Sequence, residues 1–101
     1  MKFVFILPAL ALAFSAQAAT PEEAMNKAGC MACHAKDKKM IGPSFKDIAA
    51  KYKGQDVTAK LMEKVRKGGS GNFGPIPMAP NGPDKINDAD LTAAIAFILK
   101  S

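Results

Sequence analysis

Apolar residues recur at helical spacing in four stretches of the chain, each bounded by capping or breaking residues. The first predicted helix follows Thr20 and Pro21, which suit an N-cap and a first helical position, and runs towards Cys30. The second follows Pro43, and its apolar residues at i, i+3, i+4 and i+7 extend it as far as Tyr52. The first half of the chain is therefore predicted to be helical.

Two further helical patterns occupy the second half of the chain. One starts near Asp56 and stops at Gly68, and the other starts after Asn87, an N-cap followed by acidic residues. No stretch alternates polar and apolar residues as a strand would, so the chain is predicted to be all-α. The apolar faces expected to be buried are Val57, Leu61, Met62 and Val65 in the third helix, and Leu91, Ala94, Ile95, Ile98 and Leu99 in the fourth.

The last two helices are separated by residues 68–83, which include five glycines and four prolines. A loop of that length in so small a domain is usually functional or disordered. Because it also carries apolar residues, among them Phe73 and Met78, we expect it to pack against another part of the molecule.

Residues 1–18 have the pattern of a secretory signal peptide. An early lysine precedes the uncharged and mostly apolar residues 3–14, and Ala16 and Ala18 have the spacing of a cleavage site. The apolar run is shorter than the roughly 20 residues of a membrane span, which disfavours an uncleaved anchor. We therefore predict cleavage after Ala18, export to the periplasm and a single domain over residues 19–101.

The size and composition of this domain indicate that a metal or a cofactor completes its core. The chain has 101 residues, two cysteines, and a formal net charge of +5 with thirteen lysines but one arginine. So low an arginine content argues against nucleic-acid recognition, in which bidentate arginines read bases. A domain this small rarely builds a stable core unaided, and two cysteines are too few for a disulfide scaffold. A metal or a large cofactor is therefore expected.

Residues 30–34 read Cys-Met-Ala-Cys-His, the C-x-x-C-H motif at which c-type haem is attached. On a helical turn Cys30 and Cys33 share one face, so both thiols can reach the vinyl groups on one edge of a porphyrin. His34 follows directly and can bind the iron from one side. The motif therefore predicts one covalently bound haem c with its iron.

Other interpretations of the two cysteines explain less of the sequence. A thioredoxin-like redox pair belongs in a β-α-β context, and no strand is predicted here. A structural zinc site needs four ligands, whereas His34 is the only histidine. A simple disulfide between Cys30 and Cys33 would leave that histidine without a role.

The single histidine leaves the sixth iron ligand to a methionine. Met25 lies on the helix of the motif and is better interpreted as a core residue. Met31 lies inside the motif and cannot reach the far face of the ring, and Met40 follows the motif too closely to cross the haem easily. Met62 has a helix-face position typical of core residues, whereas Met78 lies 44 residues after His34 in the proline-rich loop. Met78 is the favoured ligand, and the alternatives are a Met62 ligand or a Met78 that only packs on the core. The full set is Met25, Met31, Met40, Met62 and Met78.

Four segments together resemble the small bacterial class I cytochromes c of the c-551 and c-552 group. They are residues 30–34 (CMACH), 40–43 (MIGP), 46–52 (KDIAAKY) and 71–81 (GNFGPIPMAPN). The resemblance extends over essentially all of residues 19–101. It implies an all-α class I cytochrome c fold, in which about four helices wrap round one covalently bound haem.

The resemblance also implies roles for individual residues. His34 and Met78 would be the axial ligands of the haem iron, and such ligation raises the reduction potential. The carbonyl of Pro43 would accept a hydrogen bond from the other ring nitrogen of His34 and fix its orientation. The side-chain amide of Asn81 would hydrogen-bond near the sulfur of Met78.

One position departs from the pattern of these relatives. Phe73 would pack on the haem ring, but relatives commonly carry tryptophan there, whose indole N–H can donate to a haem propionate. Phenylalanine has no such donor. Lys64 or Arg66 on the third helix is expected to bind the propionate instead, and solvent is expected to enter more easily at that group.

These features together imply one-electron transfer without substrate turnover. A six-coordinate iron has no open position for oxygen or peroxide, and the only histidine is already a ligand. We expect a diffusible periplasmic monomer, without a stable membrane anchor, that shuttles electrons between respiratory membrane complexes and a terminal reductase, peroxidase or oxidase. The alternatives are a small haem peroxidase or gas-binding sensor with a labile Met78, and a fixed subunit of a larger reductase.

Lysines flank the predicted haem site and would steer redox partners that carry acidic patches. For any single lysine, a solvated surface position is the simpler interpretation. Without Lys2 the positive excess is only four charges, and haem propionates would reduce it. The lysines concerned are Lys27, Lys36, Lys38, Lys39, Lys51 and Lys53.

Overall fold

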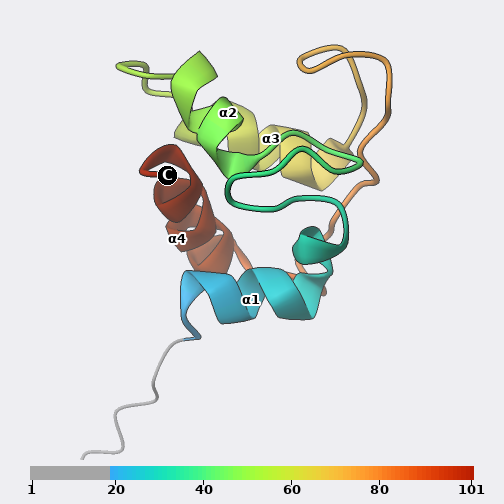
Figure 1. Ribbon diagram of the computed structural model, residues 1–101. Helices are drawn as coiled ribbons and strands as arrows, with labels where there is room; N and C mark the ends of the chain where they lie inside the picture. Colours follow the sequence, from blue (N-terminus) through green and yellow to red (C-terminus); the bar gives the residue numbers. More distant parts are fainter. Residues whose placement is uncertain (1–18) are drawn as a thin grey trace, which may run out of the picture.

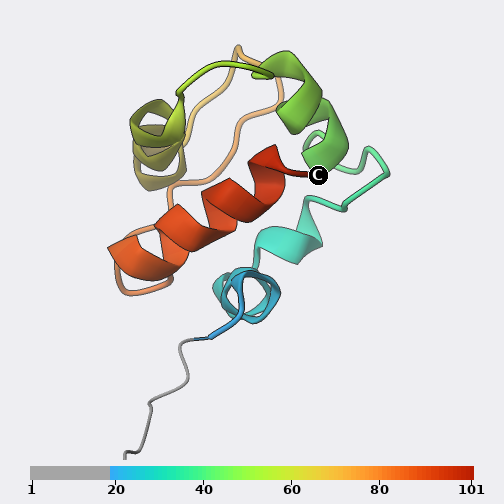
Figure 2. The same ribbon diagram turned by 90° about the vertical axis from the view of Figure 1, so that its left-hand side faces the viewer.

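The computed structural model describes residues 19–101, so the predicted signal peptide lies outside the described residues. Within that range the chain contains no β-strand, and none of its helices has the length and apolar content of a membrane span. In Figures 1 and 2, α4 lies between α1 on one side and α2 and α3 on the other. The four helices are α1 (Pro21–Ala28), α2 (Phe45–Lys51), α3 (Thr58–Lys67) and α4 (Asp88–Leu99).

Side-chain caps fix where three of the helices begin. A capping oxygen satisfies a backbone N–H that has no partner within the helix, which typically stabilises a protein by about 1 kcal/mol. Two of the caps are the predicted ones, Thr20 and Asn87. The bonds run from Glu23 N to Thr20 Oγ1 at 3.2 Å, from Asp47 N to Ser44 Oγ at 3.1 Å and from Asp90 N to Asn87 Oδ1 at 2.8 Å.

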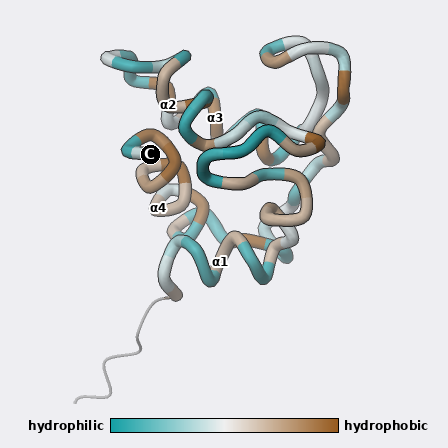
Figure 3. Tube along the Cα trace, in the orientation of Figure 1, coloured by the Kyte–Doolittle hydropathy of each residue, from teal (hydrophilic) through white to brown (hydrophobic). Residues whose placement is uncertain are grey.

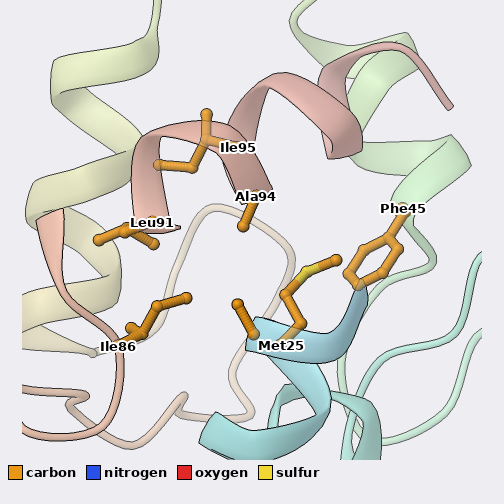
Figure 4. Close-up of a cluster of buried hydrophobic side chains, with 7 residues drawn as sticks. Met25, Phe45, Ile86, Leu91, Ala94 and Ile95 are labelled. Atoms are coloured by element: carbon orange, nitrogen blue, oxygen red, sulfur yellow. The ribbon is translucent and has the colours of Figure 1, made fainter. Parts of the chain in front are cut away.

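The core lies where α1 and the start of α2 meet α4, which packs on each of the other three helices. Hydrophobic residues are concentrated along α4 (Figure 3), and it supplies the largest share of the buried cluster. The cluster is small, as expected for a domain that needs a cofactor. Its members, most of them labelled in Figure 4, are Ala24, Met25, Phe45, Ile86, Leu91, Ala94 and Ile95.

Two details differ from the predicted helices. The first helix ends at Ala28 rather than continuing to the motif, because Gly29 adopts a left-handed conformation with φ of 87°. The third begins at Thr58 rather than near Asp56, and Val57 occupies its N-cap position. Both differences lie at helix ends, where local pattern constrains structure least.

The predicted burial of the third helix is only partly correct. Val57 is buried, but Leu61, Met62 and Val65 are half-buried, and so are Ile98 and Leu99 at the end of α4. Most of these side chains pack on the edge of the core, and three of them, Leu61, Val65 and Ile98, line a cavity. An apolar face next to a cavity remains partly accessible even though it points inwards.

Candidate functional site

The first cysteine of the motif begins a single 3₁₀ turn, η1 (Cys30–Ala32), and the second, Cys33, follows this turn directly. The backbone N–H groups of Cys33 and His34 both donate to the carbonyl of Cys30, at 3.2 and 3.0 Å. Side chains at i and i+3 eclipse each other in such a turn, which brings the two sulfurs to one face. Both cysteines are half-buried free thiols.

The surroundings of Cys30 favour a neutral thiol. Burial raises the pKa of Cys30 above its ordinary value, a backbone hydrogen bond opposes this, and the nearby Cys33 raises it further. The nucleophilic cysteine of a redox-active C-x-x-C pair has the opposite property, a lowered pKa. The structure therefore disfavours the thioredoxin-like interpretation of the motif.

His34 is held by the segment that returns after the motif. Its Nδ1 donates a hydrogen bond of 2.8 Å to the carbonyl of Pro43, since a carbonyl can only accept. In the neutral imidazole this leaves the lone pair on Nε2, the atom that can then bind a metal. The ring of Phe45 stacks on the imidazole with centroids 5.7 Å apart, so packing fixes the ring as well.

Gly42 lies directly against the imidazole, a role that the sequence analysis missed. A Cβ at this position would lie 2.5 Å from Cε1 and 2.8 Å from Nδ1 of His34. The N–H of Gly42 donates to the carbonyl of Cys33 at 2.8 Å, which ties it to the motif. Glycine is therefore the residue that fits without displacing the ring. Its signal in the sequence is weak, because a glycine before proline is also typical of an ordinary turn.

A cavity of about 390 Å³ lies beside the motif, a volume typical of small-molecule sites. Its wall is mainly apolar, and all four helices and the loop of residues 68–83 contribute to it. Of the residues predicted to bind, attach or pack on the haem, or to support its ligands, only Asn81 and the propionate candidate Arg66 do not line it. The predicted site residues that do are Cys30, Cys33, His34, Pro43, Phe73 and Met78.

The five methionines of residues 19–101 differ in their relation to this cavity. Only Met25 and Met78 line it, and Met25 is 1% exposed within the core cluster of α1 and α4. Met62 lies outside the cavity, and its sulfur lies 3.6 Å from the hydroxyl oxygen of Thr92. The geometry therefore favours Met78 over Met62 as an iron ligand.

Backbone contacts with the start of its own loop hold Met78 in place. Met78 and Gly69 form an isolated antiparallel bridge with two hydrogen bonds of 2.9 Å. Gly68 has a left-handed φ of 68°, and a Cβ there would clash with the carbonyl oxygen of Met78. Among residues 71–80, Met78 is the one that is not exposed. The loop therefore brings this thioether against the cavity and leaves its neighbours in solvent.

The tip of the loop is anchored on the end of α2. Phe73 meets the ring of Tyr52 edge-on, with centroids 6.4 Å apart. The ammonium of Lys51 lies 4.5 Å from the centre of the Phe73 ring and donates to the carbonyl of Asn72. Phe73 is still 40% exposed, so it lines the rim of the cavity rather than its interior.

Two of the residues considered for polar roles, Arg66 and Asn81, do not line the cavity. Lys64 lines it, but the guanidinium of Arg66 is hydrogen-bonded elsewhere, which leaves Lys64 as the candidate partner for a propionate. The amide of Asn81 donates to the carbonyl of Ala79 at 3.0 Å. The role of Asn81 near the sulfur of Met78 stays a prediction.

Comparison with known proteins identifies the family. A family model described as cytochrome c matches residues 18–101. The chain belongs to the cytochrome c family. It is 52% identical over 84 residues to cytochrome c2 of Rubrivivax gelatinosus, covering 82% of this chain and 99% of that protein. It is also 52% identical over 81 residues to cytochrome c-551 of Azotobacter vinelandii, covering 79% and 95%.

A solved structure agrees with these matches. The crystal structure of wild-type cytochrome c552 from Nitrosomonas europaea has a TM-score of 0.70 and 41% identity, and covers 78% of this chain and 96% of that one. The all-α class I cytochrome c fold predicted from the sequence is thereby confirmed, and so is the predicted haem c with its iron. Cytochromes c are electron carriers, which places this chain in electron transport.

The residues around the cavity are chemically suited to such a cofactor. Two cysteine thiols at the cavity wall, an imidazole with a free Nε2 and a thioether on a loop supply the donor types found in cytochromes c. The remaining wall is mainly apolar and would keep water from a porphyrin. The donor set and the cavity of this cytochrome c are thus compatible with a covalently held haem.

Proposed function

We propose that this cytochrome c is a periplasmic carrier of single electrons. Cys30 and Cys33 would form the thioether bonds to the haem, and His34 and Met78 would be the axial ligands of its iron. The observation that carries the proposal is that these four side chains line one cavity. When bound, the haem supplies a one-electron couple at its iron. The proposed location rests on the pattern of residues 1–18, which lie outside the described residues.

The chain's own residues would keep the proximal ligand rigid. The hydrogen bond from Nδ1 of His34 to the Pro43 carbonyl selects the tautomer with a free Nε2 and raises the basicity of that nitrogen. Gly42 and Phe45 restrict rotation of the ring from two directions. A ligand fixed in this way needs no reorientation before it binds iron.

The same assignment disfavours enzymatic activity. With side chains in both axial positions, no coordination site is open for oxygen or peroxide. His34 is the only histidine, so no second imidazole is present for acid–base chemistry. A peroxidase or a gas sensor would require Met78 to leave the iron readily, which the Gly69–Met78 bridge opposes.

An optical spectrum of the purified holoprotein tests the proposal directly. We expect a low-spin spectrum in both oxidation states, with a sulfur-to-iron charge-transfer band in the ferric form near neutral pH. That band reports methionine ligation. A high-spin ferric spectrum without it would instead favour the peroxidase or sensor alternative.

Partner recognition is proposed to rest on the lysines around the site. All six lysines named in the sequence analysis are exposed, although Lys51 also holds the loop tip. Exposed charges steer encounters over distances of about one Debye length, which is roughly 10 Å at 0.1 M salt. The partners would therefore present acidic patches and bind transiently.

Ionic strength should change the rate of electron transfer with such a partner. We expect the bimolecular rate to fall as salt is raised from about 10 mM to physiological levels, since screening weakens the attraction. Replacing Lys38 and Lys39 with glutamine should lower the low-salt rate and flatten this dependence. Lys85→Gln is the control, because Lys85 is exposed and does not line the cavity. A rate independent of salt would exclude steering.

A further inference from the structure

Arg66 has an unusual set of contacts for the only arginine in a chain with thirteen lysines. It lies in the last turn of α3, and its side chain is 20% exposed. One guanidinium nitrogen, Nη1, donates to the carbonyls of Ile86 at 2.7 Å and Asn81 at 3.3 Å. The other, Nη2, pairs with a carboxylate oxygen of Asp88 at 2.6 Å.

These three acceptors belong to parts of the chain that need to be held together. Asn81 ends the segment that follows Met78, Ile86 is a buried core residue before α4, and Asp88 is the first residue of α4. A planar guanidinium can reach several acceptors at fixed angles, whereas a lysine ammonium is a single flexible point charge. Because Asp88 is 79% exposed, its ion pair with Arg66 contributes less to holding these segments together than the two carbonyl contacts do.

The contacts of Arg66 lie at one end of the short segment that carries Met78. The other end is fixed by the bridge between Met78 and Gly69. The N–H of Asn81 also donates to the carbonyl of Val65 at 2.8 Å, next to Arg66 in sequence. Between the two fixed points lie only Ala79 and Pro80, and proline restricts the backbone further.

We propose that Arg66 is a positioning residue for Met78: its guanidinium fixes the return of the loop to α3 and α4 and so keeps the thioether at the cavity. The inference rests on the proposed role of Met78 as an axial ligand. Without the guanidinium contacts, the segment around residues 79–81 would detach more often. Met78 would then leave the cavity in a larger fraction of molecules while the core of α1 and α4 stayed folded.

Competition with imidazole measures that fraction in the ferric holoprotein. Added imidazole can take the sixth position only while Met78 is away, so its apparent affinity scales with the open population. We expect Arg66→Lys to bind imidazole roughly ten-fold more tightly than the unmodified protein, equivalent to 1.4 kcal/mol. Asp88→Asn, which leaves both carbonyl contacts in place, should raise the affinity by about two-fold, in line with a weak exposed ion pair.

Two controls separate positioning from general stability. Lys67→Ala removes the exposed pair between Lys67 and Glu63 on the same helix and should leave imidazole affinity unchanged. Thr20→Ala removes the cap of α1, so it lowers the stability of the whole fold away from the loop. If Thr20→Ala raises the affinity as much as Arg66→Lys, Arg66 is merely structural and the proposal is wrong.

The remaining outcomes are also decisive. An unchanged affinity in Arg66→Lys overturns the proposal, and if that variant does not accumulate, an unchanged affinity in Arg66→Gln, which also loses the guanidinium, overturns it. Failure of the ligand assignment would be visible earlier and differently, because the unmodified ferric protein would then lack the sulfur-to-iron band.

Discussion

Replacing Met78 with alanine is expected to leave the haem attached and to open the sixth position of its iron to water or an added ligand. Attachment survives because the proposed covalent bonds are at Cys30 and Cys33. The reduction potential should fall by an amount on the order of 0.1 V, within the roughly 0.8 V range over which axial ligands tune haem, because a thioether favours the reduced iron. Optical spectra and a redox titration of the variant measure both effects.

Met62→Ala is the matched control for this prediction. Met62 is half-buried and lies outside the cavity. Truncating a fully buried methionine to alanine lowers the free energy of unfolding by about 2–5 kcal/mol, so Met62→Ala should lower it by less. Its ferric spectrum should remain that of a methionine-ligated iron. If Met62→Ala abolishes the sulfur-to-iron band while Met78→Ala preserves it, the ligand assignment is wrong.

Gly42→Ala is expected to displace the imidazole of His34. The added methyl group would lie 2.5 Å from Cε1, whereas carbon atoms in contact are usually about 3.5–4.0 Å apart. The ring would have to move by about 1 Å, which breaks its hydrogen bond to Pro43 and misaligns Nε2. We expect the free energy of unfolding to fall by about 1–3 kcal/mol, as it does when an extra methyl group is forced into a packed site, and the spectrum to become partly high-spin. Thermal unfolding and the optical spectrum measure these changes.

Gly82→Ala provides a control of the same size. A Cβ at position 82 would meet only the end of the Asp84 side chain, which is exposed and can turn away. Its spectrum and unfolding temperature should stay close to those of the unmodified protein. Equal effects of the two substitutions, or an unchanged spectrum in Gly42→Ala, would contradict the role assigned to Gly42.

The features that could be predicted from the sequence depend on neighbouring residues. Thr20 and Asn87 identify their helix starts because a capping side chain bonds to an N–H only three residues later. The motif at residues 30–34 likewise indicates haem attachment from local spacing alone, because Cys30 and Cys33 are about one helical turn apart. Met78 required more than spacing, and its loop composition together with the resemblance pointed to it.

The features that could not be predicted depend on residues far apart in the chain. The contact between Gly42 and the His34 ring exists because the segment after the motif folds back onto it, and a Gly-Pro pair alone does not indicate what it faces. Arg66 was considered for a propionate, yet its acceptors are 15 to 22 residues away. The partial burial of α3 likewise depends on a cavity that no local pattern specifies.

The packing of α1 against α4 also has a consequence for how this protein folds. Ala24 and Ala94 belong to the same buried cluster although 70 residues separate them, so the chain must close a long loop before the core can form. Loop closure of this kind carries an entropic cost that grows with length, and it slows folding relative to helical proteins with local contacts. Because Met25, Leu91 and Ile95 line the cavity from these two helices, the binding pocket is completed only when both ends of the domain have met.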